Sequence, residues 1–272
     1  MPSVQISNAA EILLSKKAFV IHEYSSNFFN SWYSIPLGRL LFVEKGALHL
    51  KVTDRQLMVP AGYCAWIPAE TAHEIWANTK TIVLRSVYFE SSFCKNPCFR
   101  QLTVFNGSDL FCNMIRHTEK WNGLQGENEY EFTFATVLRQ MMPDEMRKAF
   151  LIALPSTNHA GIQTLLNYIH QNFNKQLTVN DLIKAGNYSL RTLQRLFITE
   201  TGIPFSTYLK YMRIIKAVEM LSTTSMRVSE ISWAVGYSSV PTFTNTFKSV
   251  TGHRPDFFQA KQSSAIYTPI AE

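Results

Sequence analysis

The pattern of apolar and polar residues divides the chain into a strand-rich first part and a helical last part. From about Phe19 to Phe89, short apolar stretches are interrupted by Gly and Pro, and Leu48–Val52 alternates apolar and polar residues as a half-buried strand does. Many short strands in so short a region favour a small barrel or sandwich. Helical periodicity follows over Asp109–Trp121 and Asn128–Met142, and it predicts a helix in each segment.

The helical last part repeats itself at an offset of about 50 residues, which indicates a duplicated structural unit. Tyr188-Ser189 recurs as Tyr237-Ser238, Phe197 recurs as Phe247, and Thr201-Gly202 recurs as Thr251-Gly252. Each copy predicts a helix, a short turn and a second helix. The turns are expected at Gly186-Asn187 and at Gly236, because Gly and Asn accept the left-handed backbone conformation. Ser189 in the first copy and Ser238 or Ser239 in the second are expected to cap the helix after the turn.

The second helix of each copy is expected to bury one face and to expose the other. The expected buried faces are Leu190, Leu193, Leu196 and Phe197 in the first copy and Phe243, Thr246, Phe247 and Val250 in the second. The expected exposed faces are Arg191, Gln194 and Arg195 in the first copy and Pro241, Asn245 and Lys248 in the second. Arg can bind guanine through two hydrogen bonds, and Gln or Asn can bind adenine in the same way. A solvated polar face is the alternative for either helix alone, but two copies with matched turns favour binding in the major groove of DNA.

The charge is distributed unevenly between the two parts. The net charge is +6, and residues 160–272 hold 11 Lys and Arg against 6 Asp and Glu, whereas residues 1–159 hold 15 against 14. Basic charge concentrated in the part that carries the repeat is typical of a nucleic-acid-binding domain. A mildly basic surface without a nucleic-acid partner is the alternative.

The composition excludes several classes of protein. Hydrophobic residues make up 46% and charged residues 17%, which is typical of a globular protein. No apolar run is long enough to span a bilayer, Met1–Phe19 lacks the pattern of a secretory signal, and the 4 Cys residues are too few for a disulfide framework. We therefore expect a cytoplasmic protein of two domains that has no membrane partner. Cys94 and Cys98 are expected to be ordinary thiols.

Residues 162–260 resemble the DNA-binding domain of the AraC/XylS family of bacterial transcription regulators. The resemblance is carried by SLRTLQRLFITETGIPFSTYLKYMRIIKAVEML and by VSEISWAVGYSSVPTFTNTFKSVTGHRPDFF. It implies two helix-turn-helix units joined by a long helix, here about Phe205–Leu221. It also implies that the groove-facing positions are Arg191, Gln194 and Arg195 in the first unit and Pro241, Thr242 and Asn245 in the second. The family usually has Arg at the position of Asn245, a polar residue at that of Pro241 and Gly at that of Asn187.

The first part resembles the cupin-type sensor domain found in many of these regulators. Gly62, Pro68 and His73 have the spacing of the second cupin motif, with Glu70 where Gly is usual. Cupin enzymes bind a metal through an earlier His-x-His pair, but the matching segment here begins with His22 and lacks the second His. We therefore expect no metal, no other cofactor and no catalytic residues. Instead, a small-molecule effector is expected to bind near Trp66, His73 and Trp76.

These observations predict a two-domain fold, with a mostly β, cupin-like barrel and packed helices followed by an all-α domain with two helix-turn-helix units. Residues 1–105 are expected to form the barrel sensor domain, residues 106–155 a helical dimerisation or linker region, and residues 162–262 the DNA-binding domain. The resemblance implies a homodimer that binds double-stranded promoter DNA beside RNA polymerase and activates transcription. The alternatives are a metal-dependent cupin enzyme, a repressor without small-molecule control, and an interaction module that binds no DNA.

Overall fold

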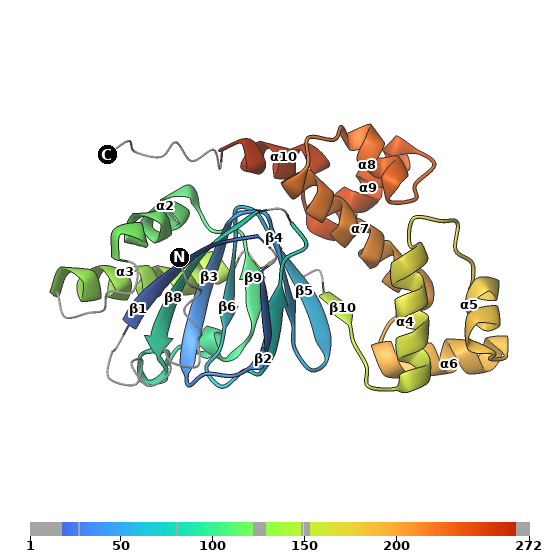
Figure 1. The fold of residues 1–272 in the computed structure, drawn as a ribbon, viewed down its shortest axis with the longest axis horizontal. Helices are drawn as coiled ribbons and strands as arrows, with labels where there is room; N and C mark the ends of the chain where they lie inside the picture. Colours follow the sequence, from blue (N-terminus) through green and yellow to red (C-terminus); the bar gives the residue numbers. More distant parts are fainter. Residues whose placement is uncertain are drawn as a thin grey trace. The chain divides into compact units, whose positions relative to one another are not determined.

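The computed structural model describes residues 18–26, 28–79, 81–121, 129–147, 149 and 153–264. The chain forms two compact units. The first contains the described residues up to Leu48 and those from Ala61 to Ala149, and the second contains His49–Pro60 together with the described residues from Ala153 onward. Figure 1 shows that the strands belong to the earlier part of the chain and that the later part is helical.

The strands form two five-stranded sheets. The first sheet has the order β1 (Ala18–Ser25), β8 (Ile82–Glu90), β3 (Leu37–Lys45), β6 (Tyr63–Ile67) and β9 (Thr103–Phe105). The second has the order β10 (Ala153–Pro155), β5 (Arg55–Pro60), β4 (Ala47–Lys51), β7 (His73–Trp76) and β2 (Phe29–Tyr33). Neighbouring strands of the first sheet pair in antiparallel fashion, as do β10 with β5 and β2 with β7. The prediction of a mostly β first part is confirmed.

Two α-helices pack against the first sheet through an apolar cluster (Figure 1). They are α2 (Asp109–His117) and α3 (Glu129–Met146), with the short 3-10 helices η1 (Ser91–Phe93), η2 (Pro97–Arg100) and η3 (Thr118–Trp121) nearby in the chain. The buried members of the cluster include Leu40, Phe42, Trp66, Val87, Phe89, Phe105, Phe111, Ile115, Leu138 and Met142. The predicted helix over 109–121 therefore ends as an α-helix at His117 and continues as η3, while the predicted helix over 128–142 extends to Met146. Asn128 lies outside the described residues.

The last part of the chain is a series of helices, as predicted. They are α4 (Ala160–Asn172), α5 (Val179–Gly186), α6 (Leu190–Thr201), α7 (Phe205–Thr223), α8 (Val228–Ala234), α9 (Val240–Thr251) and α10 (Pro255–Ser264). The long connecting helix α7 begins at the expected residue and extends two residues beyond the expected end. Leu182, Leu193 and Phe197 are buried in the first helix-turn-helix unit, and Ile231, Phe243 and Phe247 in the second. Each unit thus has an apolar inner side of its own.

Among the described residues, no helix is both long enough and apolar enough to cross a bilayer.

Candidate nucleic-acid interface

The first helix-turn-helix unit consists of α5 and α6, and its turn has the predicted geometry. Thr178 caps α5: its hydroxyl donates to the Asp181 carboxylate over 2.7 Å and its backbone N–H over 2.8 Å, and these hydrogen bonds lower the pKa of Asp181. Asn187 ends α5 with a φ of +54°, in the left-handed region. Ser189 then caps α6 by accepting a hydrogen bond from the Thr192 N–H over 3.3 Å. The chain therefore turns sharply between the two helices without leaving the start of α6 uncapped.

The second unit, α8 and α9, has the same construction. Gly236 occupies the left-handed position with a φ of +88°, and a Cβ there would lie 2.6 Å from the Asn174 carbonyl oxygen. Glycine is therefore required both by the backbone conformation and by the close approach of another segment. Ser239 caps α9 by accepting from the Thr242 N–H over 3.4 Å. Of the two serines that the sequence left open, Ser239 is thus the cap.

The two units also end in the same way, which explains the repeated Thr-Gly pair. The Thr201 hydroxyl lies 2.6 Å from the Phe197 carbonyl oxygen, and the Thr251 hydroxyl lies 2.9 Å from that of Phe247. The Gly after each Thr has a positive φ, which ends the helix in the left-handed conformation. The repetition in the sequence is therefore a repetition of local structure.

The second helix of each unit exposes the polar residues that the periodicity predicted. In α6, Arg191, Gln194 and Arg195 are exposed, while Leu193 and Phe197 are buried. In α9 the exposed residues are Pro241, Thr242, Asn245 and Lys248, while Phe243 and Phe247 are buried. The two exposed faces have the same register on their helices, since both buried positions recur 50 residues later.

One residue of the first helix-turn-helix unit differs from the expectation. Leu190 was placed on the buried face, but it is 47% exposed, because the first residue of a helix has no preceding turn to cover it. Ile198 is equally exposed and lies among Arg191, Gln194 and Arg195 by helical periodicity. The exposed face of α6 therefore includes an aliphatic side chain beside its polar ones.

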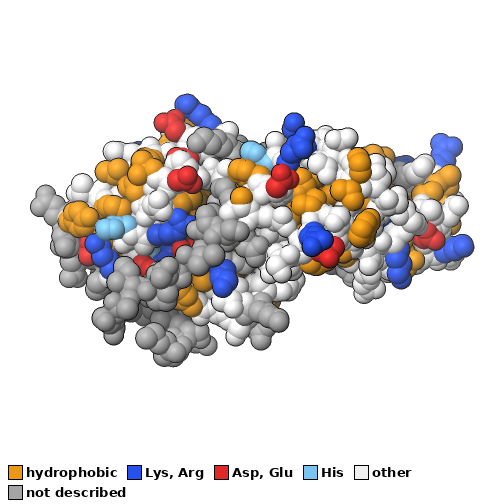
Figure 2. Space-filling view, turned by 90° about the horizontal axis from the view of Figure 1, so that it is seen from above, with side chains coloured by type: hydrophobic (Ala, Val, Ile, Leu, Met, Phe, Trp, Pro, Cys, Tyr) orange, Lys and Arg blue, Asp and Glu red, His pale blue; other side chains and the backbone are white. Residues whose placement is uncertain are grey.

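The polar side chains on these faces are largely uncommitted. Within the described helices, no hydrogen bond or ion pair engages the side chains of Arg191, Gln194 and Arg195. Thr242 differs, because its hydroxyl donates to the Ser239 hydroxyl over 3.1 Å as part of the helix cap. Figure 2 shows Lys and Arg side chains beside hydrophobic ones at its right-hand end, where Figure 1 draws α5 and α6. This combination of exposed cations, amide and aliphatic groups on a short helix fits the edges of base pairs.

Among the predicted effector-binding residues, His73 lies in a polar cluster of the strand-rich first part of the chain. Its ring is 1% exposed and packs on the Tyr33 ring with centroids 4.4 Å apart. Nδ1 lies 2.7 Å from the Thr71 carbonyl oxygen and therefore carries the proton, while the buried Nε2 has no hydrogen-bond partner among the described residues. Burial lowers the pKa of His73 to about 4, so the ring is neutral at pH 7.

The same cluster holds a buried cation, Arg39. Its guanidinium donates to the Tyr33 hydroxyl over 2.7 Å and to the Ser86 hydroxyl over 2.8 Å, and it pairs with Glu23 at 3.3 Å. The fully buried Arg39 lies on β3, where the other charged residues, Glu44 and Lys45, stand at the end of the strand. Burial raises the pKa of Glu23, although the charge of Arg39 opposes that shift. Sequence analysis missed Arg39, because a single Arg in an apolar strand does not reveal which face it occupies.

The structure does not bring Trp66 and Trp76 together with His73. Trp66 belongs to the apolar cluster beneath the helices, where its indole N–H donates to the Phe99 carbonyl over 2.9 Å. Trp76 lies three residues after His73 on β7, and successive side chains of a strand alternate between faces, so the two side chains point to opposite sides. The three residues therefore do not line one pocket.

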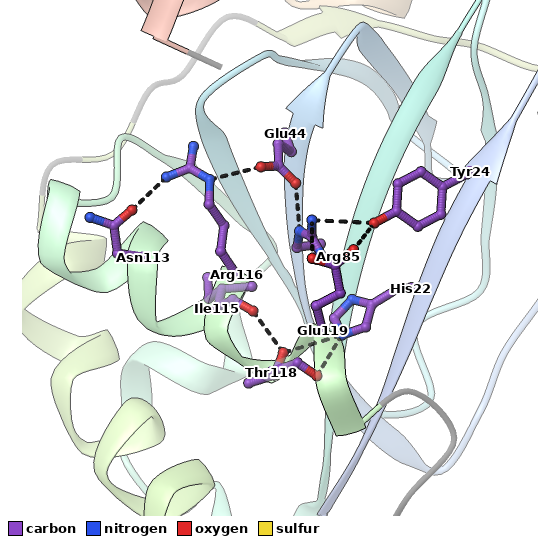
Figure 3. A network of polar contacts seen from close by, with 9 residues as sticks. All are labelled: His22, Tyr24, Glu44, Arg85, Asn113, Ile115, Arg116, Thr118 and Glu119. Carbon is purple, nitrogen blue, oxygen red and sulfur yellow. Dashed lines mark hydrogen bonds and ion pairs between the residues drawn. The ribbon is translucent and has the colours of Figure 1, made fainter. Parts of the chain in front are cut away.

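His22, the other histidine considered for a metal site, is part of a separate polar network (Figure 3). Its Nε2 lies 2.9 Å from the Thr118 carbonyl oxygen, and burial lowers its pKa. Among the described residues, no group of three or more His, Cys, Asp and Glu side chains has the arrangement to bind a metal. Cys94 and Cys98 are free thiols that pack on the apolar cluster, and burial raises the pKa of both.

Comparisons with known proteins agree with the helix-turn-helix geometry. A family model described as "Helix-turn-helix domain" matches residues 182–261. The regulatory protein SoxS of Salmonella typhimurium is 32% identical over 87 residues, which are 32% of this chain and 81% of SoxS. The HTH-type transcriptional regulator NimR of Escherichia coli is 23% identical over 246 residues, which are 90% of this chain and 87% of NimR.

Among solved structures, the chain is similar to ToxT from Vibrio cholerae, with 14% identity, a TM-score of 0.38, and coverage of 90% of this chain and 99% of that chain. The assignment to a family rests on the sequence relatives, since the match to SoxS exceeds 30% identity and covers most of that protein. These relatives are regulators and not enzymes, which decides against a metal-dependent cupin enzyme. The chain belongs to the AraC/XylS family of DNA-binding transcription regulators.

Proposed function

We propose that this regulator binds promoter DNA sequence-specifically through α6 and α9, which enter two successive segments of the major groove. The observation that carries this proposal is the matched pair of capped helices, each with buried aromatic or aliphatic residues behind an exposed polar face. A single exposed polar helix is common on protein surfaces, whereas two with the same turn, cap and register favour a shared ligand that itself repeats.

In the first unit, Arg191, Gln194 and Arg195 would supply the base contacts. Arg favours guanine O6 and N7, Gln favours adenine, and the neighbouring Ile198 can contact a thymine methyl group. In the second unit, Asn245 and Lys248 would supply the polar contacts, with Thr242 limited by its role in the helix cap. Pro241 has no donor, so we expect the first unit to discriminate between sequences more strongly than the second.

The length of α7 is compatible with binding to two turns of the groove. Its 19 residues span about 28 Å at ~1.5 Å per residue. With the widths of the flanking units added, α6 and α9 would be separated by about one turn of DNA, ~34 Å. Each monomer would therefore recognise an asymmetric site with two short contacted segments about 10 base pairs apart.

We propose activation as the direction of control, through contact with RNA polymerase at the bound promoter. Curated relatives of this chain include a protein named as the lactose operon transcription activator of Staphylococcus xylosus. Repression without small-molecule control is the alternative outcome. In vitro transcription with and without the regulator separates the two directions.

We also propose that the chain has the three-part domain organisation expected from its sequence. Residues 1–105 would form a cupin-like sensor domain, residues 106–155 would support a homodimer, and residues 162–262 would bind DNA in the bacterial cytoplasm. The cupin-like proposal is supported by Glu70, which stands where the motif usually has Gly and has a φ of +60°. His73 and Arg39 are the groups that we propose for effector recognition, since Nε2 of His73 can accept a hydrogen bond from a hydroxyl of the effector.

The test of this function is to map the sites bound by the full chain across the genome of its source bacterium, and then to measure affinity for the recovered sites by fluorescence anisotropy. We expect recovery of a common two-segment sequence at promoters and an affinity that falls steeply as salt rises. Equal affinity for recovered and scrambled sites would refute sequence-specific regulation.

A further inference from the structure

The two helix-turn-helix units are in contact at the turn that follows α4. This turn, residues 173–176, leads from α4 into α5, the first helix of the first helix-turn-helix unit. The turn of the second unit packs against it, since a Cβ at Gly236 would meet the carbonyl oxygen of Asn174 at 2.6 Å. In addition, the Gln176 side-chain amide donates to the Gly236 carbonyl oxygen over 3.3 Å. Backbone from the first unit thus lies directly against backbone from the second.

One side chain of the connecting helix binds both sides of this contact. Arg213 on α7 donates through Nε to the Phe173 carbonyl over 2.8 Å and through Nη2 to the Lys175 carbonyl over 2.7 Å. Its guanidinium also lies over the Tyr237 ring, 5.6 Å from the centroid, and Tyr237 directly follows Gly236 in the second unit. The half-buried Arg213 therefore reaches the first unit by hydrogen bonds and the second by a cation–π contact.

Arg suits this position for physical reasons. Phe173 is the C-terminal cap of α4, so its carbonyl lies at the negative end of the helix dipole, where a cation is favourable. The planar guanidinium supplies two N–H groups at fixed spacing while its face remains available to an aromatic ring, which a Lys ammonium cannot do. Burial and the nearby Tyr237 act in opposite directions on its pKa, with burial lowering it.

From these contacts we infer that Arg213 is a positioning residue, which fixes the angle and separation of α6 and α9 by holding the 173–176 turn against the Gly236–Tyr237 turn. We do not expect Arg213 to contact DNA itself. It determines which spacing between the two contacted DNA segments the protein accepts. This inference rests on the proposed function, because spacing selectivity exists only where both units bind DNA.

The experiment measures affinity of the full chain for its mapped site and for sites with one base pair inserted or deleted between the two segments. One base pair turns the second segment by about 34°. We expect wild-type protein to lose about tenfold or more in affinity at either altered spacing. Arg213→Lys keeps the charge but loses the planar pair of N–H donors. We expect the preference of this variant for the native spacing to fall below about threefold.

A matched control and a second variant complete the test. Lys210→Gln removes an exposed charge from the same helix away from these contacts, so it should weaken binding at every spacing and retain the wild-type preference. Gln176→Ala removes only the hydrogen bond to Gly236 and should relax the preference in the same direction as Arg213→Lys. Thermal unfolding of each variant identifies any that do not fold. If Arg213→Lys does not fold, the spacing preference of Gln176→Ala is the test of the inference.

The outcomes distinguish the inference from the function on which it rests. If wild-type protein discriminates between spacings and both Arg213→Lys and Gln176→Ala retain that discrimination, Arg213 has no positioning role and the inference is wrong. If wild-type protein itself accepts all spacings equally, the second unit does not read DNA, and both the proposed function and the inference fail.

Discussion

Arg195 lies on the exposed face of α6, one helical turn beyond Arg191, and no ion pair within the described helices competes for its guanidinium. If it binds a guanine through two hydrogen bonds, Arg195→Ala should cost ~1–3 kcal/mol at the mapped site and relax the preference at one base position. Lys184→Ala is the control, because it removes an exposed charge from α5. Anisotropy titrations on the native site and on single-base variants supply the comparison. If Arg195→Ala binds with the affinity and base selectivity of the wild-type protein, Arg195 does not contact a base.

Two residues without glycine's conformational freedom occupy positions where the resembled motifs usually have Gly. Among the described residues, Glu70 and Asn187 are the non-glycine residues with a positive φ. Asn tolerates this conformation because its short polar side chain bonds locally, whereas Glu incurs a steric cost on the order of 1 kcal/mol. We expect Glu70→Gly to stabilise the protein by up to about 1 kcal/mol and Asn187→Gly to change its stability by less. Urea unfolding measures both, and a destabilised Glu70→Gly would mean that the Glu70 side chain contributes more than its strain removes.

Residue types with a strong local preference were the ones that sequence analysis placed correctly. The left-handed positions Asn187 and Gly236 and the cap Ser189 follow from backbone sterics and from hydrogen bonds within a few residues, so the sequence contains the information. The alternation over Leu48–Val52 predicts His49 on the polar face of a half-buried strand, but His49 is 3% exposed and its Nε2 lies 3.3 Å from the Glu219 carboxylate. That environment depends on a segment 170 residues away in the chain, which a local alternation cannot reveal.

At the scale of elements, a buried polar network attaches α2 and η3 to the first sheet (Figure 3). Arg85 on β8 pairs with Glu44 on β3 at 2.5 Å and with Glu119 on η3 at 3.3 Å, and Arg116 on α2 reaches the second oxygen of Glu44 at 2.8 Å. Tyr24 on β1 donates a hydrogen bond to Glu119. Both Arg85 and Glu44 are at most 5% exposed, so neither charge is screened by water.

Because this network is buried, we expect a single substitution in it to lower the free energy of unfolding substantially. Glu44→Gln removes the buried carboxylate that Arg85 and Arg116 share and leaves Arg85 paired only with the partly exposed Glu119. Breaking a buried pair in this way costs ~3–5 kcal/mol. The control is Arg147→Met, which removes one partner of an exposed pair with Asp144 and should cost no more than about 0.5 kcal/mol. Urea unfolding followed by tryptophan fluorescence gives both values. Similar small costs for the two variants would show that the network does not stabilise the packing of α2 on the sheet.

Helices α4 and α7 meet at a half-buried histidine that makes their packing sensitive to pH. His170 Nε2 lies 2.9 Å from the Tyr208 hydroxyl, and burial, with smaller effects from Lys216 and His49, lowers the pKa of His170 to about 4. The unfolded chain takes up this proton near pH ~6.5, so acid favours unfolding. The stability that the neutral His170 contributes to the fold is complete above pH ~6.5 and is lost as the pH falls toward 4.

The expected result is a loss of stability of at most about 1.4 kcal/mol per pH unit from this group between those limits. His170→Gln retains a hydrogen-bond partner for Tyr208 but cannot titrate, so its unfolding free energy should fall less steeply than that of wild type. Chemical unfolding at pH 7.5 and at pH 5.0 provides the comparison. Parallel losses in the two proteins would contradict a neutral His170 in the folded protein.

At the scale of the whole molecule, sequence analysis anticipated a strand-rich part followed by two helix-turn-helix units, because periodicity, Gly positions and the internal repeat are properties of short segments. It did not anticipate that His49–Pro60 would belong to the same compact unit as the helices, or that Trp66, His73 and Trp76 would lie apart. Those features depend on which strands become neighbours and on which face each side chain takes. The apolar character of both sides of β3 and β6 conceals that choice from the sequence.

The central claim is that α6 and α9 bind the same face of one DNA site together. Inserting five base pairs between the two contacted segments turns the second segment to the opposite face of the double helix. The most direct test is the affinity of the full chain for the mapped site with and without this insertion, measured by fluorescence anisotropy at one salt concentration. Simultaneous binding by both units predicts that affinity for the inserted site falls by about tenfold or more. Equal affinity for the two sites would show that the protein binds through its first helix-turn-helix unit alone.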